Sequence, residues 1–219
     1  MRWSEFFRPH TSIPVTPWTA STRWDLSLKR TIILVFGLSL FGIGETLLVI
    51  SGLGNTPWMV LAQGISLQTS LSIGLSTFLV STVVLSLWIP LRERPGFGTL
   101  ANIVVIASVI DIAINLIPHQ HQIALRLLYV FLGIALVGLG SGFYITCGLG
   151  PGPRDGWMTA LHRRTGKPIW QVRLSIELIV LTCGALLGGT VGVGTALFAL
   201  LIGQSVALAF GVVARITQR

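Results

Sequence analysis

Residues 147–161 read Cys-Gly-Leu-Gly-Pro-Gly-Pro-Arg-Asp-Gly-Trp-Met-Thr-Ala-Leu, and they interrupt a long apolar run before a short helical one begins. Glycine reaches positive φ freely, while proline fixes φ and removes a backbone donor, so this stretch predicts a broken helix and a new helix start near Arg154. At membrane depth such a break is tolerated only where protein or water satisfies the backbone. The free N–H groups of a helix start are a ready site for an anion.

The composition around this stretch is that of an integral membrane protein. Of 219 residues, 52% are hydrophobic and 10% are charged, whereas a soluble domain has roughly 25% charged residues. The net charge of +8 would indicate a nucleic-acid partner only on a soluble fold with a basic face. Here the basic residues lie between apolar runs, so we expect the lipid bilayer as partner and no nucleic acid.

Six apolar runs are long enough to cross a bilayer, at about 20 residues each. Positive residues are retained on the cytoplasmic side of a membrane. With the N-terminus inside, every Lys and Arg outside the spans falls on the inner side, and the outer side has only Arg126, at the edge of the fourth span. Both termini are therefore expected to be cytoplasmic, with a disordered arm over 1–29 and a tail over 215–219. The predicted spans are 31–51, 71–91, 97–117, 124–147, 169–188 and 193–214.

A repeat appears at a fixed offset of 96 residues. It predicts an all-α membrane protein built from two three-span units, residues 30–117 and 126–214, each with a Gly/Pro-broken loop and a short helix after its first span. Because three is odd, the units enter the membrane from opposite sides, which is the construction common in secondary transporters. The matching glycine pairs are Gly37/Gly133, Gly42/Gly138, Gly44/Gly140, Gly52/Gly148, Gly54/Gly150, Gly96/Gly192 and Gly98/Gly194.

Charged residues inside apolar spans are costly and need a reason. Arg173 and Glu177 are four residues apart on one helix face, and they are either a structural ion pair or part of a polar cluster with Arg154 and Asp155. Glu45 is either a proton or cation site or a neutral hydrogen-bonded acid. Asp111 is either a coupling acid or a solvated residue near the outer end of its span.

These residues define two candidate sets. No set of metal ligands is evident, because His119 and His121 read as a solvated loop, and no cofactor is expected. The tryptophans read as interface anchors. Proton or ion coupling is assigned to Glu45, Glu177 and Asp111, and substrate binding to Gly148, Gly150, Arg154, Asp155, Arg173 and Glu177.

The sequence lacks G-x-x-x-x-G-K-[ST], H-E-x-x-H and G-x-S-x-G motifs, so we expect neither nucleotide hydrolysis nor another enzymatic activity.

The second unit resembles the YczE/YyaS/YitT-type bacterial integral membrane proteins. The resemblance implies a polytopic helical protein of the bacterial cytoplasmic membrane and supplies no catalytic residues. In the first unit, Met59 stands where this family is expected to carry an aspartate. The matching segments are Gly148–Asp155, Arg164–Gly166, Val172–Arg173, Ile176–Glu177, Leu187–Gly189, Gly192–Thr195 and Leu200–Gly203.

Three functions fit these features. The first is a small secondary transporter or permease, compatible with a homo-oligomer, in which Arg154 and the helix start hold an anionic group and Glu177 or Glu45 couples protons. The second is a membrane scaffold or regulatory protein that transports nothing. The third is a substrate-capture subunit of an energy-coupling importer. The sequence does not identify the solute.

Overall fold

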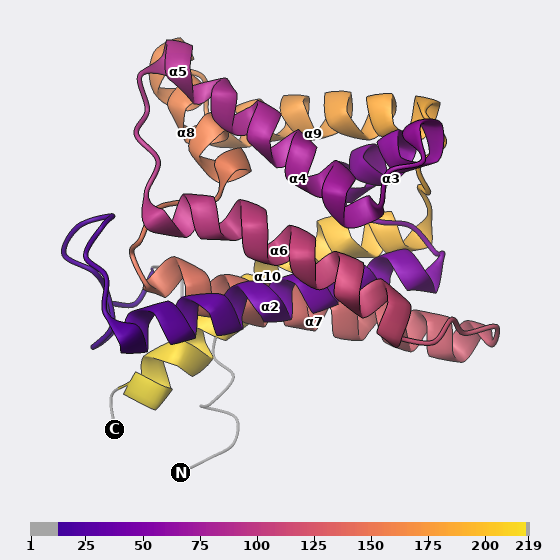
Figure 1. The fold of residues 1–219 in the computed structure, drawn as a ribbon, viewed down its shortest axis with the longest axis horizontal. Coiled ribbons are helices and arrows are strands. Elements are labelled where there is room, and N and C mark those ends of the chain that lie inside the picture. The colour runs from indigo at the N-terminus through magenta and orange to yellow at the C-terminus, as the bar shows by residue number, and fades with distance from the viewer. Residues whose placement is uncertain (1–12, 218–219) are drawn as a thin grey trace.

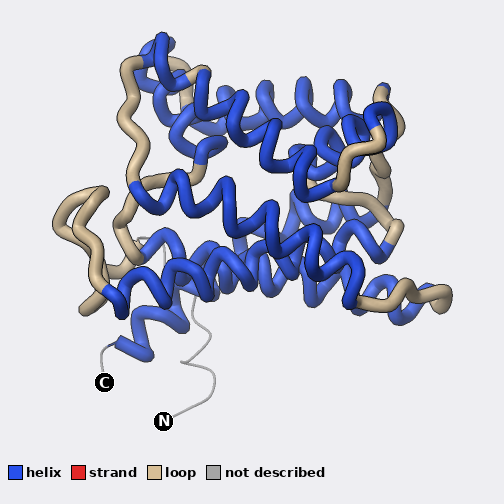
Figure 2. Tube along the Cα trace, in the orientation of Figure 1, coloured by secondary structure: helices blue, strands red, loops and turns tan. Residues whose placement is uncertain are grey.

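The computed structural model describes residues 13–217, and its regular secondary structure in that range is entirely helical (Figure 1). Helices fill the body of the molecule, and the loops lie mostly at its two ends (Figure 2). The elements are α2 (Leu28–Ser51), α3 (Pro57–Thr69), α4 (Ile73–Ser86), α5 (Trp88–Leu91), α6 (Phe97–Leu116), α7 (Ile123–Thr146), α8 (Pro153–Thr165), α9 (Ile169–Leu186) and α10 (Val193–Thr217).

Six helical segments of the described chain are long and apolar enough to cross a membrane. They coincide with the six predicted spans to within a few residues, so that prediction is confirmed. The second span is made of α4 and α5 together, over Ile73–Leu91. The remaining helices, α3 and α8, are short and follow the first and fourth spans.

The helices form two layers. In Figure 1, α2, α6, α7 and α10 make the lower layer, and α3, α4, α8 and α9 make the upper one. The short helices lie toward opposite ends of the molecule, with α3 on the right and α8 on the left. Because α3 packs against α9 and α8 packs against α4 and α5, the two sequence halves interlock.

Small residues allow α2 and α7 to cross closely. A Cβ added at Gly44 would lie 2.7 Å from the carbonyl oxygen of Gly133, and one at Gly37 would lie 2.9 Å from the amide nitrogen of Tyr144. Helices in lipid gain their contact from this close packing, because the lipid tails are as apolar as the side chains. The glycines therefore act here as packing residues.

Each of the two breaks is built from glycines with positive φ followed by a proline. Gly52 and Gly54 have φ values of 60° and 119°, and Gly148 and Gly150 have 68° and 113°. Pro57 and Pro153 then occupy the first turn of α3 and α8, where a missing N–H costs nothing because that group has no intrahelical partner.

The 96-residue offset reappears in the helix boundaries. The starts of α3 and α8 are residues 57 and 153, those of α4 and α9 are 73 and 169, and those of α6 and α10 are 97 and 193. Contacts follow the same offset. The Gly98 amide donates to the Leu149 carbonyl at 2.8 Å, and the Gly194 amide donates to the Leu53 carbonyl at 2.7 Å. The break in each half of the chain is thus held by the start of the last long helix of the other half, α6 or α10.

The N-terminal arm differs from the disordered segment expected over 1–29. Residues 28 and 29 belong to α2, Thr16 and Trp18 are buried against the helices, most of residues 21–27 are exposed, and 1–12 lie outside the described residues. Trp18 is buried, and its indole N–H donates to Thr146 Oγ1 at 3.2 Å. The Ala20 amide donates to the Cys147 carbonyl at 2.9 Å. The arm is ordered because it satisfies carbonyl groups left open at the end of α7.

Candidate functional site

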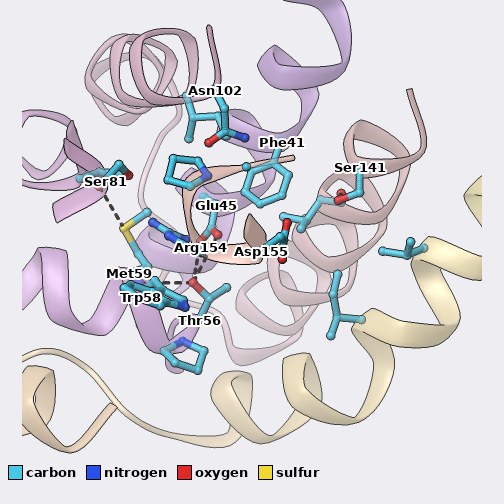
Figure 3. Close-up of a pocket in the computed structure, with 18 of the residues that line it drawn as sticks. Phe41, Glu45, Thr56, Trp58, Met59, Ser81, Asn102, Ser141, Arg154 and Asp155 are labelled. Atoms are coloured by element: carbon cyan, nitrogen blue, oxygen red, sulfur yellow. Dashed lines mark hydrogen bonds between the residues drawn. The ribbon is translucent and has the colours of Figure 1, made fainter. Parts of the chain in front are cut away.

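A cavity of about 250 Å³ lies in the centre of the bundle. All six spans and both short helices contribute to its lining, as Figure 3 shows for part of it. Ser81, Ile106, Glu177 and Val206 line it from near the midpoints of their spans. The cavity therefore lies near the middle of the candidate membrane spans.

Glu45 is a buried acid in this cavity, with its side chain held by the start of α3. Thr56 Oγ1 donates to the Glu45 carboxylate, at 3.0 Å from Oε2 and 3.2 Å from Oε1. The same Thr56 oxygen accepts a hydrogen bond from the Met59 amide at 3.3 Å and so caps α3. The helix cap and the acid are thus coupled through one hydroxyl group.

Arg154, in the first turn of α8, meets Trp58, in the first turn of α3. The guanidinium carbon lies 5.0 Å from the Trp58 ring centroid, which is within the range of a cation–π contact. The two residues are 96 apart, so equivalent positions of the two units touch at the centre of the cavity (Figure 3). The negative charges of Glu45 and Asp155 also stabilise this guanidinium.

Asp155 follows Arg154 and presents its carboxylate to the cavity. The buried Tyr144 hydroxyl donates to Asp155 Oδ2 at 3.2 Å. An acid in the first turn of a helix is favoured by the helix dipole. The neighbouring Pro153 carbonyl accepts the Trp88 indole N–H at 2.9 Å, which fixes the start of α8 against α5.

Arg173 and Glu177 line the cavity from α9 and form the pair expected from their spacing. Arg173 Nε lies 2.9 Å from Glu177 Oε1. Their side chains are 54% and 28% exposed, respectively. The two residues therefore form an ion pair and also lie in one cavity with Arg154 and Asp155. The two interpretations, a structural ion pair and part of a polar cluster, are thus compatible.

The other candidates lie elsewhere. Gly148 and Gly150 do not line the cavity but shape the break before α8. Asp111 is also outside the cavity, where its carboxylate accepts hydrogen bonds from the Ser72 hydroxyl and the Gly74 amide, both at 2.7 Å. Asp111 therefore holds the start of α4.

Comparison with known proteins places the chain among bacterial membrane proteins. Residues 28–210 match the family of unknown function DUF6198. The chain belongs to this family. An uncharacterized protein of Haemophilus influenzae is 46% identical over 93% of this chain and 94% of its own length. Two Bacillus subtilis proteins also match, the uncharacterized membrane protein YczE (31% identical, 83% of this chain, 82% of YczE) and the uncharacterized protein YyaS (24%, 74% and 82%). The resemblance drawn from the sequence motifs to YczE and YyaS is confirmed.

No solved structure matches the chain.

Three residues of the site were missed by the sequence analysis, namely Thr56, Trp58 and Tyr144. Trp58 was interpreted as an interface anchor, but it is 6% exposed and lies under Arg154. A signal existed in the 96-residue offset, which pairs Trp58 with Arg154. Thr56 precedes Pro57, which is a typical position for a helix cap. Tyr144 carried no signal, because only the fold brings it to Asp155.

Proposed function

We propose that this protein is a small secondary transporter or permease of the bacterial cytoplasmic membrane, with the central cavity as its solute site. The observation that carries the proposal is a cavity that is lined by all six spans and contains ionisable side chains. Ionisable residues at membrane depth are costly and mark solute or ion pathways. The volume of about 250 Å³ is below the roughly 300 Å³ at which pockets for drug-sized ligands begin, which favours a small solute.

An inverted repeat supports this proposal. Residues 30–117 and 126–214 would be two units of opposite orientation. In favour are the helix starts 96 residues apart, the exchanged hydrogen bonds at Leu53 and Leu149, and the positions of α3 and α8 toward opposite ends (Figure 1). In such transporters the broken helices meet at the substrate site, and one unit rocks against the other.

The distribution of basic residues supports cytoplasmic termini. Arg163 pairs with Glu93, Arg164 donates to the Pro90 carbonyl, and the Arg23 side chain donates to the Arg94 carbonyl. These contacts gather basic residues at one end of the bundle. Arg126 lies at the other end, where its Nε donates to the Ser51 carbonyl at 2.6 Å. Positive residues are retained on the cytoplasmic side.

Within this proposal the cavity residues have distinct roles. Arg154, near both short helices, is the charged contact that a solute group would meet at the break. Glu45 and Glu177 are the candidates for proton or ion coupling, because both are acids in the cavity. Asp111 is a weaker candidate, since its oxygens are used in capping α4.

The proposal is tested by uptake into liposomes that contain the purified full-length protein. A panel of small radiolabelled solutes, covering anions, cations and zwitterions, is assayed by counterflow. We expect flux of at least one solute, loss of that flux in Arg154→Gln, and retention of it in Arg163→Gln. Arg163 is the matched control, because it lies on the same helix but is exposed and outside the cavity.

Absence of flux for every solute, together with unchanged function of Arg154→Gln in cells, would contradict transport. Recovery of one stoichiometric membrane partner would then favour the scaffold function, and co-purification of an ATPase would favour the capture subunit.

A further inference from the structure

The charges of the cavity are not those of an anion site. Three carboxylates line it, from Glu45, Asp155 and Glu177, against two guanidinium groups, from Arg154 and Arg173. With Glu45 ionised, three minus two leaves an excess of one negative charge. At low dielectric, an uncompensated charge strongly favours a ligand of opposite sign.

Both arginines lie beside carboxyl groups of the cavity, although the Arg154 side chain makes no hydrogen bond or ion pair with residues 13–217. Arg173 is paired with Glu177 at 2.9 Å. Arg154 has the Trp58 ring on one side and the negative charges of Glu45 and Asp155 nearby. An anionic solute would have to compete with these groups for either guanidinium. The expectation that Arg154 holds an anionic group is therefore not favoured by its surroundings.

One carboxylate keeps an open oxygen. Asp155 Oδ2 accepts the Tyr144 hydroxyl, whereas Oδ1 accepts no hydrogen bond from residues 13–217. Asp155 is exposed within the chain and lines the cavity. Asp155 therefore presents a hydrogen-bond acceptor to any donor that enters the cavity, and Glu45 is a second acid in the same cavity.

The wall formed by α10 has the opposite character, whereas α7 contributes the polar Ser141 and Tyr144 beside its apolar residues. Val137 of α7 and Phe198, Ile202 and Val206 of α10 are all apolar and line the same cavity. The cavity thus joins a wall of ionised groups to a wall of hydrocarbon. A ligand that satisfies both carries a charge at one end and an apolar body at the other.

The cavity also has a flank that is not closed by helix packing. In the first unit, α4 packs against α6. Their counterparts 96 residues later are α9 and α10, and no comparable contact joins these two helices within the described chain. Both α9 and α10 line the cavity, and Arg173 at this flank is 54% exposed. Beside the cavity, α9 and α10 therefore pack against each other less closely than α4 and α6 do.

We infer that the cavity binds a small amphiphilic organic cation, with an ammonium group at Asp155 and Glu45 and an apolar body against Phe198, Ile202 and Val206. This inference rests on the proposed function and specifies its substrate class. The ammonium group supplies the donors that Asp155 lacks and neutralises the excess negative charge. Hydrogen bonds between ionised groups are about twice as strong as neutral ones.

The test uses the purified full-length protein in detergent micelles and three probes of nearly the same shape. These are 2-phenylethylammonium, the neutral 2-phenylethanol and the anionic 3-phenylpropionate. Binding is measured by titrating tryptophan fluorescence, since Trp58 lines the cavity, and by the ligand-dependent shift of the unfolding temperature. We expect saturable binding of 2-phenylethylammonium at least tenfold tighter than that of either other probe.

Variants separate the site from partition into micelles. Asp155→Asn is expected to weaken 2-phenylethylammonium binding at least tenfold, and Glu93→Gln, an acid outside the cavity, to leave it unchanged. Ile202→Trp, which fills the apolar wall, is expected to weaken it without changing the charge. The Ile202 variant keeps the test valid should Asp155→Asn fail to fold.

Tighter binding of 3-phenylpropionate, equal binding of all three probes, or full affinity in both cavity variants would overturn the inference. None of these outcomes would overturn transport, which depends on flux in liposomes. Conversely, binding of the cation without any flux would retain the site and contradict the transporter.

Discussion

Glu45 and Thr56 have no chemical counterparts in the second half of the chain. Residues 96 positions later are Ser141 and Gly152. Ser141 donates to the Val137 carbonyl of its own helix at 2.7 Å, and Gly152 caps α8 without a side chain. The acid and its hydrogen-bond donor are therefore present in one half only, although the backbone breaks in both. Proton coupling through Glu45 would therefore depend on residues of the first half of the chain alone.

Replacing Glu45 with glutamine tests that role. The amide keeps an oxygen that accepts the Thr56 hydroxyl but cannot ionise. We predict that Glu45→Gln retains counterflow of the solute and loses accumulation driven by a pH gradient, measured in the same liposomes. Loss of both activities, or of neither, would contradict a coupling role.

Asp111 gives a second prediction for a single residue. Its carboxylate serves two donors at the start of α4, and removing the acceptor leaves both without it. We expect Asp111→Ala to lower the free energy of unfolding by about 1–3 kcal/mol and to leave solute affinity unchanged. Thermal unfolding followed by binding at a temperature below the transition checks both parts. Unchanged stability with lost coupling would return Asp111 to the list of coupling acids.

At the scale of elements, the crossing of α2 and α7 depends on the absence of side chains. The contacts are reciprocal, since Gly37 meets Gly140 and Gly44 meets Gly133, and these four glycines are two pairs at the 96-residue offset. Backbone atoms cannot move aside as the end of a flexible side chain can. The crossing distance is therefore set by glycine.

Two glycine-to-alanine changes separate packing from helix propensity. In Gly44→Ala the new methyl group would lie 2.7 Å from the Gly133 carbonyl oxygen, and such overpacking costs about 1–3 kcal/mol. Gly203, on α10, has no atom within 4 Å of the added Cβ. We predict a lower unfolding temperature for Gly44→Ala and an unchanged or higher one for Gly203→Ala. Equal effects would show that the crossing tolerates a side chain.

At the scale of the whole molecule, the proposed orientation is supported by the basic residues gathered at one end of the bundle. If α8 is at the cytoplasmic end, the loop between α6 and α7 is external. Helices α3 and α8 lie toward opposite ends of the molecule (Figure 1). In the proposed transporter this would give the two breaks different access to solvent, as alternating access requires.

Cysteine labelling in intact cells tests this orientation. In a Cys183→Ser background, which removes the exposed native thiol and leaves the buried Cys147, we predict that His119→Cys reacts with a membrane-impermeant maleimide. Thr165→Cys, at the end of α8, should react only after the cells are opened. The reverse pattern would invert the protein and make its termini external.

The sequence by itself determined the six spans, the two breaks and the family, because these depend on local chemistry. Twenty-residue apolar runs, positive-φ glycines and N-terminal prolines produce their structure wherever they occur. The sequence also indicated candidate site residues, since an ionisable residue within an apolar run is costly and needs a reason. These candidates include Arg154, Asp155, Arg173, Glu177 and Glu45.

Only the tertiary structure decided which of these ions share a cavity. Asp111 and Glu45 are both acids within apolar spans, yet one holds the start of a helix and the other lines the cavity. Three other contacts likewise join residues that lie far apart along the chain or on different helices. They are the Trp18–Thr146 hydrogen bond of the N-terminal arm, the Trp58–Arg154 contact and the Tyr144–Asp155 hydrogen bond. Such contacts depend on how the helices pack, and the apolar pattern of one helix does not say which neighbour will face it.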